Sequence, residues 1–346
     1  MYSDLPADQL AAYTSSQIRP ADFESFWENT LAEARSHPLN LTVTAEPTVL
    51  ATVDVYDVQF NGWNGEPVRA WLRMPHGVTE PLPCVVEFVG YGGGRGEPQD
   101  NLLLASSGFA HRQMDTRGQG AGWSRGATAD GAGSGGPQVP GLMTRGILDP
   151  QTYYYRRLFT DAVRAVQAAR ELEWVDAGRV ALTGISQGGG VALATAALCP
   201  DVRAVVARVP FLCDFPRALQ ITDAYPYREI CDFLSIHRTE AERAQQTLAY
   251  FDGVNFAAQA TVPAMFTTGL MDPTTPPSTV YAAYNAYAGP KRMTAWPFNG
   301  HEGGGPEDDI AAIGFLREMT AADRSADGAG AGTGAGAGAG QAAAAI

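Results

Sequence analysis

The hydrophobic positions of this chain follow two different periods, and each predicts a different kind of structure. Residues 52–60 and 68–75 alternate apolar and polar side chains, and the Asn-Gly dipeptides at 61–62 and 64–65 lie between them. This pattern predicts a β-hairpin. Ahead of it, the apolar residues of 23–37 recur at helical spacing after Asp22, which can cap the helix. The chain is therefore expected to begin with a helical and hairpin extension.

Farther along, continuous apolar runs replace the alternation. They occupy 83–90, 109–115, 179–186, 202–211, 262–270 and 293–298. Amphipathic segments with helical spacing separate several of them, at 159–173, 188–198, 276–287 and 309–319. Such runs are typical of strands buried on both faces of a parallel sheet. The alternation of strands and helices predicts an α/β fold, a mostly parallel central sheet flanked by helices with right-handed crossovers.

Three segments depart from this rhythm. Residues 118–150 are rich in glycine and proline and show no period, as expected of a functional loop. Residues 212–260 are helical and aromatic and fall between two core strands, where an insertion would cover the site. The Gly/Ala-rich residues 323–346 cannot offset their ordering entropy, so we expect a disordered tail after one domain at 1–322.

Composition narrows the classes of partner. The chain is 45% hydrophobic and 18% charged, which fits a globular protein with a sizeable core. A formal net charge of -13 argues against nucleic acid and anionic membranes, and favours a small molecule. No secretory signal or membrane span is visible, and no CxxC pair points to a metal. We expect the four cysteines to be free thiols in a cytoplasmic protein: Cys84, Cys199, Cys213 and Cys231.

The strongest chemical signal is the run Gly184-Ile185-Ser186-Gln187-Gly188, which matches G-x-S-x-G. A predicted strand precedes it and a predicted helix follows, as the strained nucleophile turn of an α/β-hydrolase requires. Glycines flank the serine because side chains there would obstruct the turn. The alternative is an ordinary glycine-rich turn with a capping serine. We favour Ser186 as a nucleophile.

A serine nucleophile needs a base and an acid, which follow it along the chain in this fold. Only His237 and His301 follow Ser186, and His237 lies in a charged helical stretch typical of the surface. His301 follows a predicted strand in a loop and is the preferred base. Asp272 directly follows the run 262–270, at a strand end where catalytic groups gather, and is the preferred acid. Other carboxylates remain as alternatives: Asp214, Asp223, Asp232, Asp252 and Glu302.

The oxyanion of a tetrahedral intermediate needs two N–H donors. One is expected from the backbone of Gln187, the residue after the nucleophile. The second is expected from the glycine-rich loop 89–94, where Tyr91 or its backbone N–H would face the substrate oxygen. A phosphate cradle is the alternative for this loop, but the sequence has no G-x-x-x-x-G-K-[ST] motif.

The chain resembles the family of acetyl xylan esterases and cephalosporin-C deacetylases, carbohydrate esterase family 7, over residues 1–320. The resemblance rests on five ordered motifs: Tyr91–Gly96, Asp115–Gly120, Gly184–Gly189, Gly269–Asp272 and His301–Gly304. It implies a serine esterase that hydrolyses acetyl and other short-chain esters of sugars, such as xylo-oligosaccharides, and of cephalosporin C. It also implies a homohexamer, with no cofactor, metal, nucleic acid or membrane.

The resemblance further implies a role for each matched residue. Ser186 would be the nucleophile, His301 the base and Asp272 the orienting acid. Tyr91 and Gln187 would supply the oxyanion donors. Arg117 and Gln119 would be structural residues that brace the nucleophile turn. Two other readings stay open, namely a serine peptidase or dienelactone-type hydrolase of the same fold, and a non-catalytic scaffold.

Overall fold

A nine-stranded sheet forms the centre of the computed structural model, which describes residues 4–131 and 135–322. The strands are β1 (Thr42–Ala45), β2 (Val53–Asn61), β3 (Pro67–Pro75), β4 (Leu82–Phe88), β5 (Ala110–Met114), β6 (Val175–Ile185), β7 (Val205–Arg208), β8 (Ala264–Gly269) and β9 (Lys291–Trp296). Their order in the sheet is β1-β2-β3-β5-β4-β6-β7-β8-β9. Three neighbouring pairs are antiparallel: β1-β2, β2-β3 and β3-β5. The remaining pairs, β5-β4, β4-β6, β6-β7, β7-β8 and β8-β9, are parallel. This is the predicted mostly parallel sheet, preceded by the predicted hairpin.

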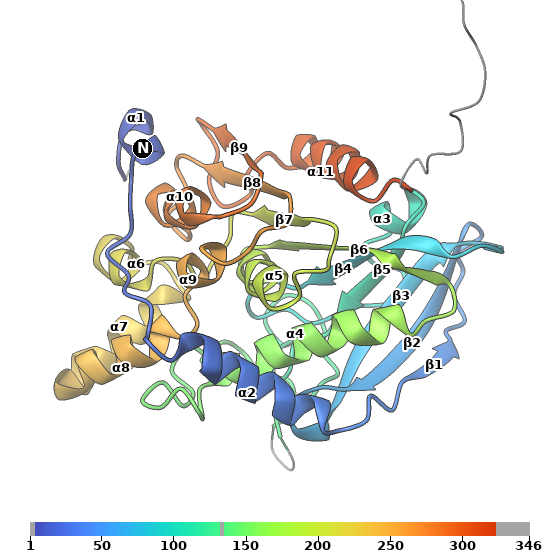
Figure 1. Cartoon of the computed structure of the whole chain (residues 1–346), viewed down its shortest axis with the longest axis horizontal. Helices are drawn as coiled ribbons and strands as arrows, with labels where there is room; N and C mark the ends of the chain where they lie inside the picture. The colour runs from blue at the N-terminus through green and yellow to red at the C-terminus, as the bar shows by residue number, and fades with distance from the viewer. Residues whose placement is uncertain (1–3, 132–134, 323–346) are drawn as a thin grey trace, which may run out of the picture.

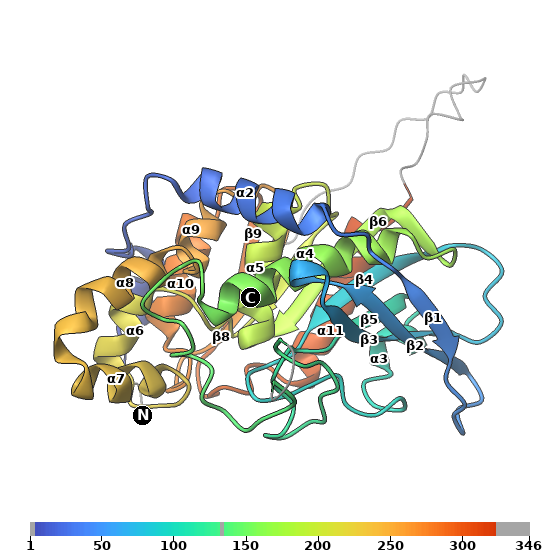
Figure 2. The same ribbon diagram turned by 90° about the horizontal axis from the view of Figure 1, so that it is seen from below.

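Helices cover both faces of the sheet, which is why its central strands are apolar throughout (Figures 1 and 2). One face carries α2 (Phe23–Arg35), α4 (Tyr154–Arg170), α5 (Gln187–Leu198) and α10 (Pro277–Ala286); the other carries α3 (Leu103–Ser106) and α11 (Pro306–Met319). Adjacent strand residues point to opposite faces. On β4, Val86 accordingly packs in the large core below α4 and α5, and Val85 packs in the smaller core below α11.

The two predicted insertions differ in structure. Four helices follow β7: α6 (Phe215–Ile221), α7 (Tyr227–Ile236), α8 (Ala241–Ala249) and α9 (Gly253–Ala257). A short 3₁₀ turn, η2 (Arg238–Glu240), joins α7 to α8. By contrast, the described residues between β5 and α4 contain no helix or strand. The remaining short elements are α1 (Ala7–Ala11) and η1 (Trp63–Gly65).

Some local predictions were wrong. The edge strand β1 was not predicted, and α4 begins at Tyr154 rather than at 159. Asp22 does not cap α2 with its side chain, because its carboxylate accepts a hydrogen bond from the Tyr250 hydroxyl at 2.5 Å instead. The tail predicted at 323–346 lies outside the described residues. Within the described part, no helix is both long enough and apolar enough to cross a membrane.

Candidate active site

Ser186 sits in a one-residue turn between β6, which ends at Ile185, and α5, which begins at Gln187. Its backbone has φ 57° and ψ -121°, a conformation that L residues rarely adopt. The glycines around it are required by close approach. A Cβ on Gly188 would lie 1.9 Å from the carbonyl oxygen of Phe88, and one on Gly184 would lie 2.2 Å from the backbone of Gly188. The turn therefore has the geometry that the sequence motif predicts.

The structure brings the predicted base to this serine. His301 lies in the loop between β9 and α11, and its Nε2 is 2.9 Å from the Ser186 hydroxyl oxygen. Its other ring nitrogen, Nδ1, is 2.8 Å from Oδ2 of Asp272. A carboxylate can only accept, so Nδ1 carries the proton and Nε2 is left to accept from the serine. Three residues far apart in the sequence thus form one hydrogen-bonded chain.

Asp272 follows β8 and is fully buried. Its Oδ1 accepts hydrogen bonds from the backbone N–H groups of Thr274 and Thr275, at 2.7 and 3.0 Å. The hydroxyl of Thr275 donates to Oδ2 at 2.7 Å and lies 3.3 Å from Nδ1 of His301. These bonds fix the carboxylate in one orientation, so the ring of His301 is fixed as well.

The alternative residues lie elsewhere. Asp214 and Asp252 are buried together in the helical insertion, where Asp252 accepts from the backbone N–H of Asp214. Glu302 accepts from the side chain of Asn299 at 3.0 Å and from the backbone N–H of Gly300 at 3.1 Å. His237 is exposed and stacks on the ring of Phe233. None of these side chains hydrogen-bonds to Ser186 or His301 in the described structure.

Tyr91 lines the cavity together with Ser186, and Gln187 directly follows Ser186 at the start of α5. Among the described residues, neither backbone N–H has a hydrogen-bond partner, so both are available to an oxyanion. The phenol of Tyr91 is turned away from this position. It donates to the carboxylate of Glu229 at 2.9 Å and accepts from the backbone N–H of Leu142 at 2.7 Å. Burial and the charge of Glu229 raise the pKa of Tyr91, so its phenol stays protonated.

Gln119 connects the loop that carries Tyr91 to the side chain of Gln187. Its Oε1 accepts from the backbone N–H of Gly92 at 2.7 Å, and its Nε2 donates to the side chain of Gln187 at 2.9 Å and to the Tyr154 hydroxyl at 2.9 Å. The Tyr155 hydroxyl also donates to Gln187. Gln119, Gln187, Tyr154 and Tyr155 are all fully buried. This network fixes Tyr91 and Gln187 relative to each other.

Arg117 has a different role from the expected one. Among the described residues its side chain makes no hydrogen bond to the nucleophile turn; instead its guanidinium forms a bidentate pair with Asp161 of α4, at 2.5 and 2.9 Å. It also bonds to Glu66, at 2.7 Å. Arg117 therefore fixes the loop after β5 to the helix layer, and only Gln119 of the pair braces the turn.

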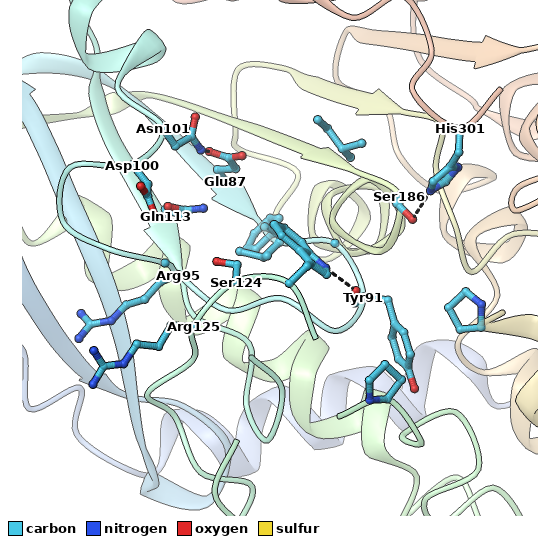
Figure 3. Close-up of a pocket in the computed structure, with 18 of the residues that line it drawn as sticks. Glu87, Tyr91, Arg95, Asp100, Asn101, Gln113, Ser124, Arg125, Ser186 and His301 are labelled. Carbon is cyan, nitrogen blue, oxygen red and sulfur yellow. Dashed lines mark hydrogen bonds between the residues drawn. The ribbon is translucent and has the colours of Figure 1, made fainter. Parts of the chain in front are cut away.

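A cavity of about 940 Å³ opens beside Ser186 and His301. Figure 3 shows these two residues at one end, with Tyr91 nearby, and a group of polar side chains at the other. Trp123 and the insertion residues Tyr225 and Pro226 also line it. Within the described ranges no group of three or more His, Cys, Asp or Glu side chains could hold a metal ion.

The sequence did not point to Thr275, Tyr154, Tyr155 or Trp123. Thr275 lies three residues after the predicted acid, and Tyr154 and Tyr155 begin the helix after the long loop. Their proximity to the site follows from tertiary contacts alone, and the only available signal was the tyrosine run 153–155.

The strained serine turn, at the carboxyl end of a parallel strand in a helix-covered sheet, defines the chain as an α/β-hydrolase. Residues 1–319 match the acetyl xylan esterase family, AXE1, and the chain belongs to this family.

Solved relatives have the same fold. An acetyl xylan esterase from Paenibacillus sp. R4 is 38% identical with a TM-score of 0.83, covering 91% of this chain and 100% of that one. Acetyl xylan esterase 1 from Thermoanaerobacterium sp. JW/SL YS485 is 33% identical with a TM-score of 0.82, covering 91% and 99%. Among curated proteins, acetyl esterase Axe7A from Xylanibacter ruminicola is 28% identical over 84% of this chain. That match spans 65% of the length of the curated relative.

Proposed function

We propose that this chain is a carboxylic ester hydrolase that removes short acyl groups, chiefly acetyl, from sugars such as acetylated xylo-oligosaccharides and from cephalosporin C. The observation that carries the proposal is the hydrogen-bonded chain from Ser186 through His301 to Asp272. Membership of the acetyl xylan esterase family supports the acetyl group as the acyl part.

In the first half of the proposed reaction, Ser186 attacks the acetyl carbonyl while its proton moves to Nε2 of His301. Asp272 stabilises the imidazolium that forms and keeps the ring in the required tautomer. The carbonyl oxygen becomes an oxyanion and accepts from the backbone N–H groups of Tyr91 and Gln187. When the tetrahedral intermediate collapses, the C–O bond to the alcohol breaks and His301 returns its proton to the departing alcohol.

The second half of the proposed reaction hydrolyses the acetyl-enzyme and releases acetate. A water molecule gives a proton to His301 and attacks the carbonyl carbon of the acetyl-Ser186 ester. The same two N–H groups bind the second oxyanion, and the bond to Ser186 breaks as His301 reprotonates its oxygen. Acetate leaves and the free serine is restored, so the cycle consumes one water for each ester.

Two further inferences concern the setting of the enzyme. We infer a reducing, cytoplasmic location, supported by four cysteines that are all free, three of them buried. We also infer a homohexamer, which is supported only by the resemblance to the family. Gel filtration with light scattering would test the hexamer, and a mass near that of the monomer would reject it.

Substitution of the nucleophile tests the proposed reaction. Ser186→Ala should lower turnover of 4-nitrophenyl acetate by about 10⁴-fold or more. Ser235→Ala is a matched control, because Ser235 is exposed on α7, does not line the cavity and donates to the carbonyl of Asp232. The wild type should also be labelled at Ser186 by a fluorophosphonate probe. Retention of a tenth of the activity by Ser186→Ala would reject this nucleophile, and a wild type that does not react would favour a scaffold.

A further inference from the structure

The cavity beside Ser186 is much larger than an acetyl group requires. Its volume of about 940 Å³ lies in the range of pockets that hold whole drug-sized ligands. Figure 3 shows that the end away from Ser186 is lined by polar side chains, which we call the polar arm. The polar arm consists of Glu87, Glu97, Asp100, Asn101, Gln113 and Arg125. The proposed acetyl group fills only the space next to Ser186. The polar arm therefore faces the other half of the ester, the alcohol.

Two strand residues form the base of the polar arm. Glu87 of β4 and Gln113 of β5 are partners in the sheet register, so they lie side by side. Gln113 is only 8% exposed, and its Oε1 accepts from Arg73 at 2.8 Å. Among the described residues its Nε2 has no hydrogen-bond partner, although the side chain lines the cavity. This amide donor is open to the cavity, where a water molecule or an oxygen of a ligand can accept from it.

Glu87 is held as a charged acceptor beside this donor. Its Oε2 accepts from Nε2 of the buried His111 and from Nδ2 of Asn101, both at 2.6 Å. Burial opposes ionisation, but His111, Arg208 and Asn101 outweigh it and hold the pKa of Glu87 below its ordinary value. Within the described structure, Oε1 of Glu87 has no hydrogen-bond partner. It can therefore accept from a hydroxyl group of a ligand.

Trp123 lies between the polar arm and the serine. Its ring packs on the loop 90–93, and its Nε1 donates to the carbonyl of Tyr91 at 2.8 Å. A Cβ on Gly90 would be 3.5 Å from this ring and 4.0 Å from Cβ of Ser186. The indole is nevertheless 66% exposed and lines the cavity. An exposed, fixed aromatic face can stack on the C–H face of a sugar ring.

We propose that the polar arm and Trp123 form the subsite for the alcohol half of the substrate, and that this subsite selects a neutral, hydroxyl-rich ring over an alcohol that carries a carboxylate. The ring stacks on Trp123, its hydroxyls donate to Glu87 and Asp100, and one of its oxygens accepts from Gln113. This inference rests on the proposed function, because it assumes that Ser186 attacks the ester carbonyl and so separates the acyl half from the alcohol half.

Charge is the reason for the selectivity. Three carboxylates line the polar arm, and the exposed cation among them, Arg125, is 3.6 Å from Glu97. Arg95, which also lines the cavity, is bound to Asp57 at 2.6 Å. Arg73 lies underneath, with its donors occupied by Gln113 and by backbone carbonyls. A carboxylate on the alcohol would therefore be repelled by three carboxylates at close range, whereas a hydroxyl can donate to them.

The test compares three acetates in the full-length protein: 4-nitrophenyl acetate, the neutral monoacetate of methyl xyloside, which keeps two free hydroxyls, and cephalosporin C, which carries carboxylates. Gln113→Glu keeps the acceptor for Arg73 and removes the donor. This variant and Trp123→Ala should each lower the ratio of kcat/KM for the xyloside over 4-nitrophenyl acetate by about 3- to 10-fold. Ile236→Ala, which removes an exposed apolar side chain of α7 outside the cavity, should leave the ratio unchanged.

Asp100→Asn provides an independent measurement, because Asp100 is exposed and its loss should be tolerated. This variant should narrow the preference of the wild type for the xyloside over cephalosporin C several-fold. The inference is overturned if all three variants keep wild-type ratios within about twofold. It is equally overturned if the wild type prefers cephalosporin C and Arg125→Ala abolishes that preference. A wild type that turns over none of the esters would instead reject the proposed function itself.

Discussion

Gln119 offers the sharpest test of how the two proposed oxyanion donors are held in position. Gln119→Leu removes four hydrogen bonds, the longest of them 3.4 Å, but preserves most of the side-chain volume. Two of the former partners keep another bond, since Tyr154 still donates to the carbonyl of Arg117 and Gln187 still accepts from Tyr155. Only the buried N–H of Gly92 is left unpaired. The free energy of unfolding should therefore fall by about 1–3 kcal/mol, the cost of one buried orphan donor.

The effect on catalysis should be larger than this loss of stability suggests. Complete loss of an oxyanion donor costs about 10²–10³-fold in kcat, and a displacement of about 1 Å can cost about 10²-fold. Gln119→Leu loosens both donors without removing either, so we expect kcat to fall by about 10- to 100-fold. KM should change little, because an oxyanion forms only after binding.

Initial rates with 4-nitrophenyl acetate would give kcat and KM, and urea unfolding would give the stability. Gln246→Leu is a matched control, because Gln246 is exposed and bonds only to Glu242 of its own helix. If Gln119→Leu were destabilised as expected but kept kcat within about twofold, the network would stabilise the fold without positioning the donors. A rise in KM alone would also refute the reasoning.

Three other changes test separate parts of the structure. Asp272→Asn should fold normally but lose about 10⁴-fold in kcat on 4-nitrophenyl acetate, because His301 would adopt the wrong tautomer; an unchanged rate would reject Asp272 as the acid. Arg117→Met should lower the free energy of unfolding in urea by about 3–5 kcal/mol, because the buried carboxylate of Asp161 loses its charged partner and keeps the backbone N–H of Trp63; a loss below about 1 kcal/mol would contradict this. Burial raises the pKa of Asp252 to about 7, so the folded state holds a proton that the unfolded chain releases near pH ~4. Stability should therefore fall by about 2–3 kcal/mol between pH 5 and 8, and urea titrations of Asp252→Asn should lack this slope.

The nucleophile turn could be predicted from the sequence because its requirements are local. Two glycines, a serine, an apolar run before and a helical segment after are all that the turn needs, and they are contiguous. His301 and Asp272 were predictable for a related reason. Strands of a parallel sheet end at the same edge, so residues directly after two predicted strands come together there. Because the acid and the base follow the serine along the chain in this fold, few other residues could take their places.

The supporting contacts could not be predicted in this way. Asp22 has the sequence position of a helix cap, but its carboxylate accepts a hydrogen bond from the hydroxyl of Tyr250, more than two hundred residues away. Arg117 and Gln119 are separated by one residue, yet one points to α4 and the other to the oxyanion loop. Polar side chains bond to whichever partners the tertiary structure brings within reach, and a single sequence does not give those distances. Periodicity therefore predicts the sheet and helices better than the hydrogen bonds between them.

Buried carboxylates explain how the glycine-rich loop after β5 stays in place without helices or strands. Asp115 accepts from the backbone of Arg95 and of Ala127 and from the hydroxyl of Thr128, so it joins this loop to the oxyanion loop. Asp130 serves the same purpose through Arg157 of α4 and Arg145 of the loop itself.

The charges around Asp130 set the pH range in which this anchor stabilises the loop. Burial alone would raise the pKa of Asp130, but Arg157 and Arg145 outweigh it and hold the pKa at about 2. The stability from this anchor is present above pH ~4 and is lost only as the pH falls toward 2. For Asp252, in the helical insertion, burial raises the pKa to about 7 instead, so its contribution to stability is lost as the pH rises. Between pH 5 and 8, therefore, the insertion should change in stability while the loop that carries Gln119 and Trp123 stays anchored.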